Sequence, residues 1–92
     1  MIKSFKCKHT EKLFNRIRVR KFQAFEREAR DKILLLNAAL DIKDLRVPPG
    51  NRLEKLSGNL KEKWSIRINK QWRLCFDWNQ GHAENVEILD YH

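Results

Sequence analysis

The chain reads WSIRINKQWRLCFDW over residues 64–78, and this stretch decides the fold. On both sides of the polar segment 69–71, apolar residues occupy every second position, which is typical of two half-buried antiparallel strands joined by a short turn. Both strands must present their apolar side chains to the same face, so the register should pair Ile68 with Trp72. The sequence therefore predicts a hairpin with one apolar face and one polar, open face.

The same register sets two arginines against each other on the open face. Arg67 should lie directly opposite Arg73, and like charges in that position destabilise a sheet. The arrangement is favourable if an anion sits between them, because two guanidinium groups form a good phosphate clamp. The alternative is that the two side chains splay apart into water, or pair with Asp77 or Glu87.

Residues outside the hairpin predict helices first and more sheet afterwards. Residues 2–5 alternate as a short first strand, and a short helix should follow from Thr10, with Thr10 as its cap. A helix of about 17 residues comes next, because apolar residues recur there at spacings of three and four. Its apolar face would consist of Phe22, Phe25, Ala29, Ile33, Leu36 and Leu40. Residues 48–50, Pro-Pro-Gly, cannot continue a helix. Val86 and Ile88 alternate with Glu87 and Leu89, which predicts a last strand.

This order of elements predicts an α+β fold, in which an N-terminal strand and two helices pack on one face of a small antiparallel sheet. The chain has 92 residues, which we expect to form a single domain, 1–92. It carries 20 lysines and arginines against 12 acidic residues, a formal charge of +8. Segment 1–21 alone holds eight of the bases and one acid. Such a block favours an anionic partner, either nucleic acid or an acidic protein; the alternative is a solvated face that keeps the protein soluble.

Composition also argues against several classes of protein. The longest unbroken apolar run, Ile33–Leu36, is far shorter than the ~18 residues of a membrane span, and the lysine-rich start lacks the apolar segment of a secretory signal. Cys7 and Cys75 are too few for a zinc site or a disulfide framework, so we expect reduced thiols in the cytoplasm. Neither a Gly-rich phosphate loop nor a metal-ligand spacing is found, so we expect no metal and no cofactor.

The chain end carries the side chains best suited to proton transfer. Histidine titrates near neutral pH, and a phenol can hydrogen-bond to a base or stack on it. Both types occur in the final run Asp90, Tyr91 and His92. On composition alone, such an end is more often frayed than functional. Cys75 should share the open face with Arg73, but a lone cysteine without an evident base is a poor candidate for a nucleophile.

The chain resembles a known family in several separate segments. These are Ile2–Phe5, Pro48–Asn59, Trp64–Asn69, Gln71–Phe76 and Val86–His92. Taken together they resemble the HigB toxin family of the RelE/ParE superfamily, over the whole chain. The resemblance implies a RelE-like fold whose open sheet face binds RNA, and metal-independent, ribosome-dependent cleavage of messenger RNA in the A site. It also implies a HigA-type helix-turn-helix antitoxin as partner, through which operator DNA would be met only indirectly.

The resemblance further implies which residues form the cleft. The family's sheet arginine maps onto Arg73, and its C-terminal Asp-Tyr-His maps onto Asp90, Tyr91 and His92. Some members carry a histidine and then a lysine in the loop before the hairpin. This chain departs from that pattern, with Glu54 and Ser57 at those places and Lys55 nearby. The departure puts the general base in question and implies weaker cleavage.

Cleavage of this kind needs a base for the 2′-OH, an acid for the 5′ oxygen and positive charge for the phosphorane. Arg73 is our candidate for the charge, helped by Lys55 or Arg67. His92 would be the proton donor, and Tyr91 would position or stack on a base. Glu54 is the one loop carboxylate that could act as base, although its ordinary pKa near 4.3 makes it a weak one unless burial raises it.

Further basic residues are candidates for binding rather than catalysis. Those expected to contact the RNA are Arg52, Lys55, Lys61, Lys63 and Arg67, although a surface lysine usually does nothing specific. Those expected to bind the antitoxin lie in the basic segment and are Arg16, Arg18 and Arg20. Two alternatives stay open: a non-catalytic nucleic-acid-binding co-repressor, and a gyrase inhibitor of the ParE type, which the Asp-Tyr-His ending disfavours.

Overall fold

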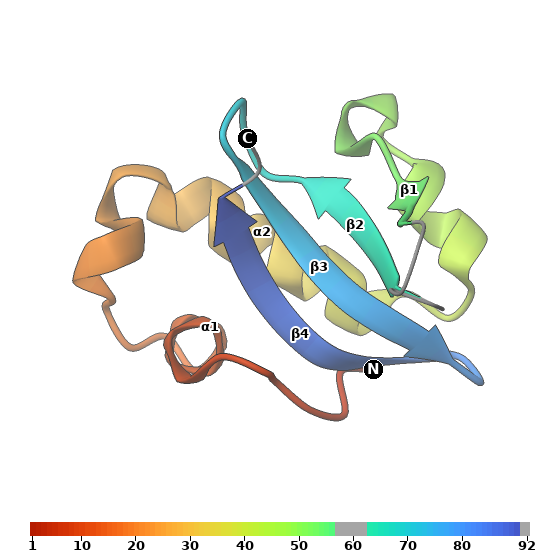
Figure 1. The fold of residues 1–92 in the computed structure, drawn as a ribbon, viewed down its shortest axis with the longest axis horizontal. Helices are drawn as coiled ribbons and strands as arrows, with labels where there is room; N and C mark the ends of the chain where they lie inside the picture. The colour runs from red at the N-terminus through yellow and green to blue at the C-terminus, as the bar shows by residue number, and fades with distance from the viewer. Residues whose placement is uncertain (57–62, 91–92) are drawn as a thin grey trace.

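The computed structural model describes residues 1–56 and 63–90 (Figure 1). In chain order, its elements are α1 (Lys8–Phe14), η1 (Arg20–Phe25), α2 (Glu26–Ala38), η2 (Ile42–Arg46), η3 (Pro49–Asn51), β1 (Glu54–Lys55), β2 (Lys63–Arg67), β3 (Trp72–Asn79) and β4 (His82–Asp90). The strands form one antiparallel sheet in the order β1-β2-β3-β4. In Figure 1, α2 lies behind the sheet and α1 lies beside β4. The expected α+β class is confirmed.

The central hairpin has the register that the alternation predicts. Strands β2 and β3 pair Ile66 with Leu74 and Arg67 with Arg73. The Ile68 N–H donates to the Trp72 carbonyl at 2.9 Å, which closes the hairpin. The side-chain oxygen of Asn69 accepts the N–H groups of Gln71 and Trp72 at 2.8 and 2.9 Å, so the turn is held by its own first residue.

The predicted apolar stripe is confirmed except at its end. Phe22, Phe25, Ala29, Ile33 and Leu36 are all buried against the sheet. Leu40, in contrast, is 83% exposed. The expected single helix is also two segments, a 3-10 turn (η1) followed by α2, which ends at Ala38.

Local capping explains where the chain leaves the helix. Asp44 accepts the backbone N–H groups of Leu40 and Asp41 through one carboxylate oxygen, at 2.9 and 3.1 Å. Asp41 in turn caps η2 by accepting the Lys43 N–H at 2.9 Å. These N–H bonds hold the pKa of Asp44 below its ordinary value. The capping box therefore ends the helix before Leu40, although the apolar spacing would have continued it, and Leu40 faces solvent.

Thr10 is not the cap of the first helix, which begins at Lys8 after Cys7. It lies fully buried inside α1, and its hydroxyl accepts the Ile88 N–H at 3.1 Å. The bond ties α1 to β4. The prediction of a cap was wrong because a threonine hydroxyl can bond a distant backbone as well as its own helix end.

The expected N-terminal strand is present only as two isolated parallel bridges to β4, from Ile2 to Ala83 and from Phe5 to Val86. The ladder is interrupted because β4 contains a bulge at Asn85, which has a left-handed φ of 52°. The Asn85 N–H donates to the Ser4 hydroxyl at 2.9 Å instead of continuing the ladder. Within the two described stretches, no helix has both the length and the apolar character that crossing a bilayer requires.

Candidate functional site

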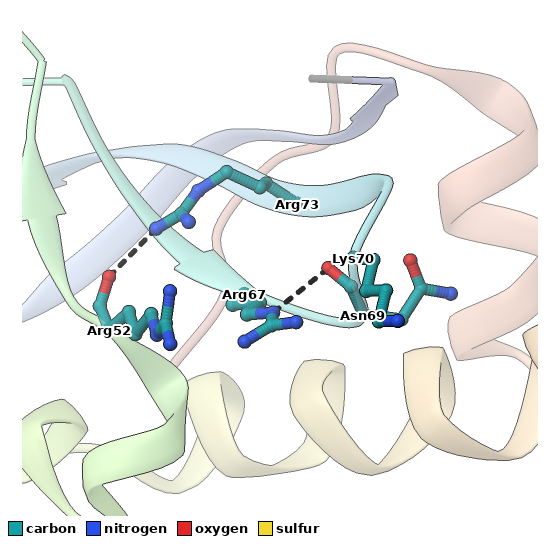
Figure 2. Close-up of a pocket in the computed structure, with 5 residues that line it drawn as sticks. All are labelled: Arg52, Arg67, Asn69, Lys70 and Arg73. Carbon is teal, nitrogen blue, oxygen red and sulfur yellow. Dashed lines mark hydrogen bonds between the residues drawn. The ribbon is translucent and has the colours of Figure 1, made fainter. Parts of the chain in front are cut away.

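A pocket of about 180 Å³ opens beside the turn of the β2–β3 hairpin (Figure 2). Its lining consists of Arg52, Arg67, Asn69, Lys70 and Arg73. Four of these five side chains are cationic, and among the described residues no acid lines the pocket. Because like charges gathered at one site repel one another, an anion bound there would lower the electrostatic energy. The pocket is therefore suited to a phosphate.

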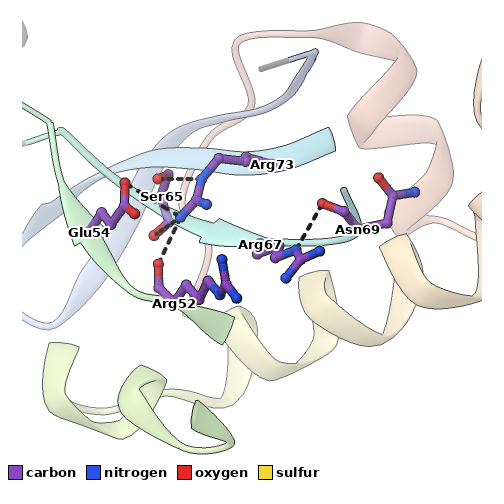
Figure 3. A network of polar contacts seen from close by, with 6 residues as sticks. All are labelled: Arg52, Glu54, Ser65, Arg67, Asn69 and Arg73. Carbon is purple, nitrogen blue, oxygen red and sulfur yellow. Dashed lines mark hydrogen bonds and ion pairs between the residues drawn. The ribbon is translucent and has the colours of Figure 1, made fainter. Parts of the chain in front are cut away.

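Arg73 is the most constrained of these cations. Its Nε donates to the Ser65 hydroxyl at 2.9 Å, and its Nη2 donates to the Arg52 carbonyl at 2.7 Å and to the Ser65 carbonyl at 3.5 Å (Figure 3). The Glu54 carboxylate lies 4.0 Å from the same Nη2. A guanidinium fixed by several acceptors is held in one orientation, which is what a preorganised charge requires.

The sequence predicted Arg73 on an open face, and the structure corrects that expectation. The face is right, since Arg73 pairs with Arg67 and Leu89 on the side opposite the core. The openness is wrong, because Arg73 is only 7% exposed. Neither of the expected alternatives, splaying into water or pairing with Asp77 or Glu87, describes it. Its acceptors are instead Ser65 on β2 and the Arg52 carbonyl in the segment that leads into β1.

A buried asparagine places that segment. Asn51 is fully buried, and its side-chain amide donates to the carbonyls of Leu45 and Val47 at 3.2 and 3.3 Å. Its side-chain oxygen accepts the ammonium of Lys32, which lies on α2. Arg52 follows with φ 45° and ψ 57°, in the left-handed region. That conformation costs an ordinary residue ~1–2 kcal/mol, and here it accompanies a carbonyl that accepts the Arg73 guanidinium.

The other pocket cations are less tightly held. The Nε of Arg67 donates to the Asn69 carbonyl at 3.1 Å. Within residues 1–56 and 63–90, the terminal nitrogens of Arg67 and the side chains of Arg52 and Lys70 form no hydrogen bond or ion pair. Figures 2 and 3 both show Arg67 between Arg52 and the hairpin turn.

The structure thus brings together Arg52, Glu54, Arg67 and Arg73 from the residues that the sequence singled out. Lys63 is not at the pocket: its side chain is 11% exposed and forms an ion pair with Asp77 at 3.7 Å. The Lys55 ammonium lies 5.7 Å from the centre of the Trp64 ring rather than in the pocket lining. Three predicted residues, Lys61, Tyr91 and His92, lie outside the described part of the chain.

Asp90 lies on the other face of the sheet from Arg73. It pairs with Trp72, whose ring stacks on that of Phe25 beneath the sheet, and its carboxylate accepts the Gln71 amide at 2.9 Å. The three arginines proposed for the antitoxin, Arg16, Arg18 and Arg20, are all exposed, in the link between α1 and η1 and at the start of η1.

Sequence reasoning missed three residues that shape the site. Lys70 lines the pocket, whereas the sequence pattern assigns it only to the turn of the hairpin. Ser65 alternates with Trp64 and Ile66 and so had to share the face of Arg73, a signal that could have revealed it. Asn51 left no local signal, because its partners are set by the folding of distant segments.

Cys75 is 1% exposed and close to Arg73 on the same strand. Burial raises the pKa of its thiol to about 11, and the nearby Glu87 carboxylate adds to the increase. The thiol therefore stays protonated near neutral pH, where a nucleophile would need to be the thiolate. Over the described stretches, no group of three or more His, Cys, Asp and Glu side chains could hold a metal ion.

Comparison with known proteins identifies the family. A family model described as the RelE-like toxin of the type II toxin–antitoxin system HigB matches residues 3–92. Toxin HigB-1 of Vibrio cholerae is 56% identical over 61 residues, and an uncharacterised protein of Haemophilus influenzae is 39% identical over 61 residues. These matches cover 66% of this chain but only 63% and 59% of the two relatives, less than two thirds of their length.

Two further likenesses extend over the whole chain. Endoribonuclease HigB of Proteus vulgaris is 30% identical over 93 residues, covering 100% of both chains. The solved YoeB-YefM complex from Staphylococcus aureus contains a chain with the same fold, at a TM-score of 0.57 and 21% identity, covering 100% of this chain and 98% of that one. Because the family model matches residues 3–92 and a relative is 30% identical over its full length, the chain belongs to the HigB-like family of RelE-like toxins of type II toxin–antitoxin systems.

Proposed function

We propose that this protein is a metal-independent endoribonuclease that cuts messenger RNA in the ribosomal A site. The observation that carries the proposal is the cationic pocket at the hairpin, with Arg73 fixed in its wall. A full-length relative named as an endoribonuclease supports the reaction class. The proposed acid, base and charge-stabilising groups are all protein side chains, so the reaction would need no cofactor.

In the proposed mechanism, Arg73 stabilises the negative charge that develops on the phosphorane, because its donors are already oriented before the RNA arrives. Glu54 accepts the 2′-OH proton from its place 4.0 Å from the Arg73 Nη2; its side chain is 51% exposed, so it acts without the burial that would make it a stronger base. His92 donates a proton to the leaving 5′ oxygen, and Tyr91 stacks on or positions a base. Asp90 receives no proton-transfer role, because its register sets it on the other face of the sheet.

Few protein groups are committed to chemistry in this scheme. We therefore propose that the ribosome orients the RNA, and that the toxin supplies charge and proton transfer. Holding the reacting groups in a near-attack geometry lowers the reaction barrier substantially. The ribosome can supply this orientation in place of the toxin.

Primer extension on a defined messenger RNA, with and without purified ribosomes, tests the proposal. We expect cuts at A-site codons only when ribosomes are present. Deleting His92 should reduce cleavage by ~10²–10⁴-fold, as expected for loss of a general acid, while circular dichroism shows an intact fold. A bulky tag at the C-terminus should impair cleavage more than the same tag at Met1.

The alternatives give different results in the same experiment. A co-repressor that acts by charge alone would bind RNA or DNA with steep salt dependence and would tolerate the His92 deletion. A gyrase inhibitor of the ParE type would induce DNA damage signalling on expression and leave messenger RNA intact. Cleavage at equal rates with and without ribosomes would leave an endoribonuclease but remove the A-site proposal.

The partner in this proposal is a HigA-type antitoxin, since the family is one of toxin–antitoxin systems. The toxin would then meet operator DNA only through the antitoxin. The exposed arginines at Arg16, Arg18 and Arg20 are our candidates for its docking surface, and the neighbouring Ile17 is 51% exposed. A basic surface with an exposed apolar side chain suits a partner with an acidic, partly apolar patch.

Changing Arg16, Arg18 and Arg20 together to glutamate should weaken antitoxin binding while cleavage persists, because none of them lines the pocket. The same charge change at the exposed residues Arg27, Lys43 and Arg46 is the matched control and should leave antitoxin affinity near the wild-type value. Calorimetric titration of each variant with the antitoxin measures the difference. Unchanged affinity together with lost cleavage would mean that the two surfaces have been assigned the wrong way round.

A further inference from the structure

The cations of the pocket fall into two groups according to their surroundings. Arg73 is buried, and the Glu54 carboxylate lies 4.0 Å from its Nη2, so part of its charge is already offset before any ligand binds. Arg52 and Lys70 are exposed and Arg67 is half-buried, and no acidic side chain described in the structure pairs with them. The strongest unbalanced positive charge therefore lies beside Arg73 rather than on it.

We propose that Arg52, Arg67 and Lys70 form a second phosphate subsite, which binds the RNA backbone next to the phosphate at Arg73. This proposal rests on the proposed endoribonuclease function. The subsite would hold the RNA in the ground state, while Arg73 acts on the reacting phosphate. Such a division separates affinity from rate. The subsite would bind the RNA equally well in the ground state and the transition state, which lowers KM but leaves the rate of the chemical step unchanged.

The geometry of the hairpin supports a subsite in this position. Arg67 lies directly across from Arg73 in the ladder, and Lys70 lies beyond it in the turn. The turn is held by the two hydrogen bonds to Asn69, and the Nε of Arg67 is anchored on the Asn69 carbonyl. Lys70 and Arg67 therefore project from a fixed backbone, which reduces the entropy lost when a ligand binds.

The arrangement also gives the substrate a direction. Arg67 and Lys70 continue from Arg73 toward the tip of the hairpin, whereas Glu54 lies on β1 and Arg52 lies just before it in the chain (Figures 2 and 3). Arg67 and Lys70 attract the RNA backbone toward the turn, whereas the Glu54 carboxylate repels any further backbone phosphate on its own side of Arg73. The RNA should thus run from Arg73 toward Lys70, with its reacting nucleotide beside Glu54 and its next phosphate at the hairpin turn.

Short RNA oligonucleotides with 2′-O-methyl groups, which cannot be cleaved, are the probe for the test. Their binding to the free toxin is followed by fluorescence anisotropy over a series of salt concentrations. Lys70→Ala and Arg52→Ala should each weaken binding several-fold and lower the salt slope by ~0.7, the value for one lost phosphate contact on a single strand. The exposed Lys43→Ala, distant in sequence from the pocket, should match the wild type.

A methylphosphonate series locates the subsite on the RNA. Replacing one phosphate at a time with the neutral group should weaken wild-type binding at one linkage, and that same linkage should lose its effect in Lys70→Ala. Wild-type affinity and salt slope in both Lys70→Ala and Arg52→Ala would overturn the subsite. If Arg73→Ala still abolishes cleavage in that case, the proposed function survives without it. If no RNA is cleaved but the linkage effect persists, the subsite stands and the proposed function fails.

Discussion

Arg73→Ala should lower the single-turnover rate of messenger RNA cleavage by ~10²–10³-fold, the usual cost of removing an oriented donor from a preorganised site. The effect should be this large because the guanidinium is held by the Ser65 hydroxyl and the Arg52 carbonyl before substrate binds. Arg73→Lys keeps the charge but loses the planar fork, so it should recover only part of the rate. Quenched-flow primer extension with saturating toxin and programmed ribosomes measures the chemical step.

The structure also predicts a stability cost for this substitution, which an open-face arginine would not have. The change to alanine leaves the buried Ser65 hydroxyl without its donor, at ~1–3 kcal/mol for a buried group left unsatisfied, and also removes the bond to the Arg52 carbonyl. Rates must therefore be compared at a temperature where urea titration shows both proteins folded. A folded Arg73→Ala protein that cuts at the wild-type rate would remove Arg73 from the mechanism.

The contrast between Arg67 and Arg73 shows how far the sequence determines the site. Their pairing could be predicted because a slip of one residue would have turned every apolar side chain of the hairpin to the wrong face. The burial of Arg73 could not, since its acceptor at Arg52 is 21 residues away in the chain and depends on a left-handed residue that is not glycine. A local sequence pattern determines the register of a hairpin. The burial of one of its side chains depends on segments that are distant in the sequence, so the same pattern does not reveal it.

Asp90 shows the opposite case, in which a single local irregularity determines the face on which a side chain lies. The β3–β4 hairpin turns at Gln80 and Gly81, both with positive φ, as a tight two-residue turn requires. Continued without interruption from the pair Asn79–His82, that register would set Asp90 on the face of Arg73. The bulge at Asn85 adds one residue to β4, and every later side chain changes face. The alternation of Val86 and Ile88 sets Asp90 on their face, whereas the family motif gives no sign of the bulge that makes this possible.

Some of the predicted basic residues lie outside the pocket because other partners are nearer to them. Lys63 and Lys55 flank the hairpin in sequence as predicted, but Asp77 and the Trp64 ring are nearer partners than the pocket. Lys70 escaped notice because turn residues are usually interpreted by their backbone geometry alone. A lysine in the turn between two strands that carry opposed arginines adds a third charge at the same end of the hairpin, and this position alone predicts that it joins them.

Phe22→Ala should lower the free energy of unfolding by ~3–5 kcal/mol, the usual cost of truncating a fully buried phenylalanine. Phe22 is fully buried. Its ring centre lies 5.7 Å from that of Phe25 and 5.9 Å from that of Trp72, and Phe25 stacks on Trp72 at 5.1 Å. This aromatic cluster joins η1 to the first residue of β3, directly before Arg73.

A domain of this size has only ~5–15 kcal/mol of total stability, so Phe22→Ala should be partly unfolded at 37 °C. Urea titration followed by tryptophan fluorescence gives the change in midpoint. The partly exposed Ile17 provides the control, and Ile17→Ala should alter stability by no more than ~0.5 kcal/mol. Cleavage by Phe22→Ala should fall in proportion to the unfolded fraction and recover on cooling, because the pocket side chains themselves are unchanged.

A midpoint equal to that of the wild type would mean that the cluster does not hold η1 against the sheet. Lost cleavage in a fully folded Phe22→Ala protein would show instead that the cluster acts on Arg73 by setting the position of Trp72.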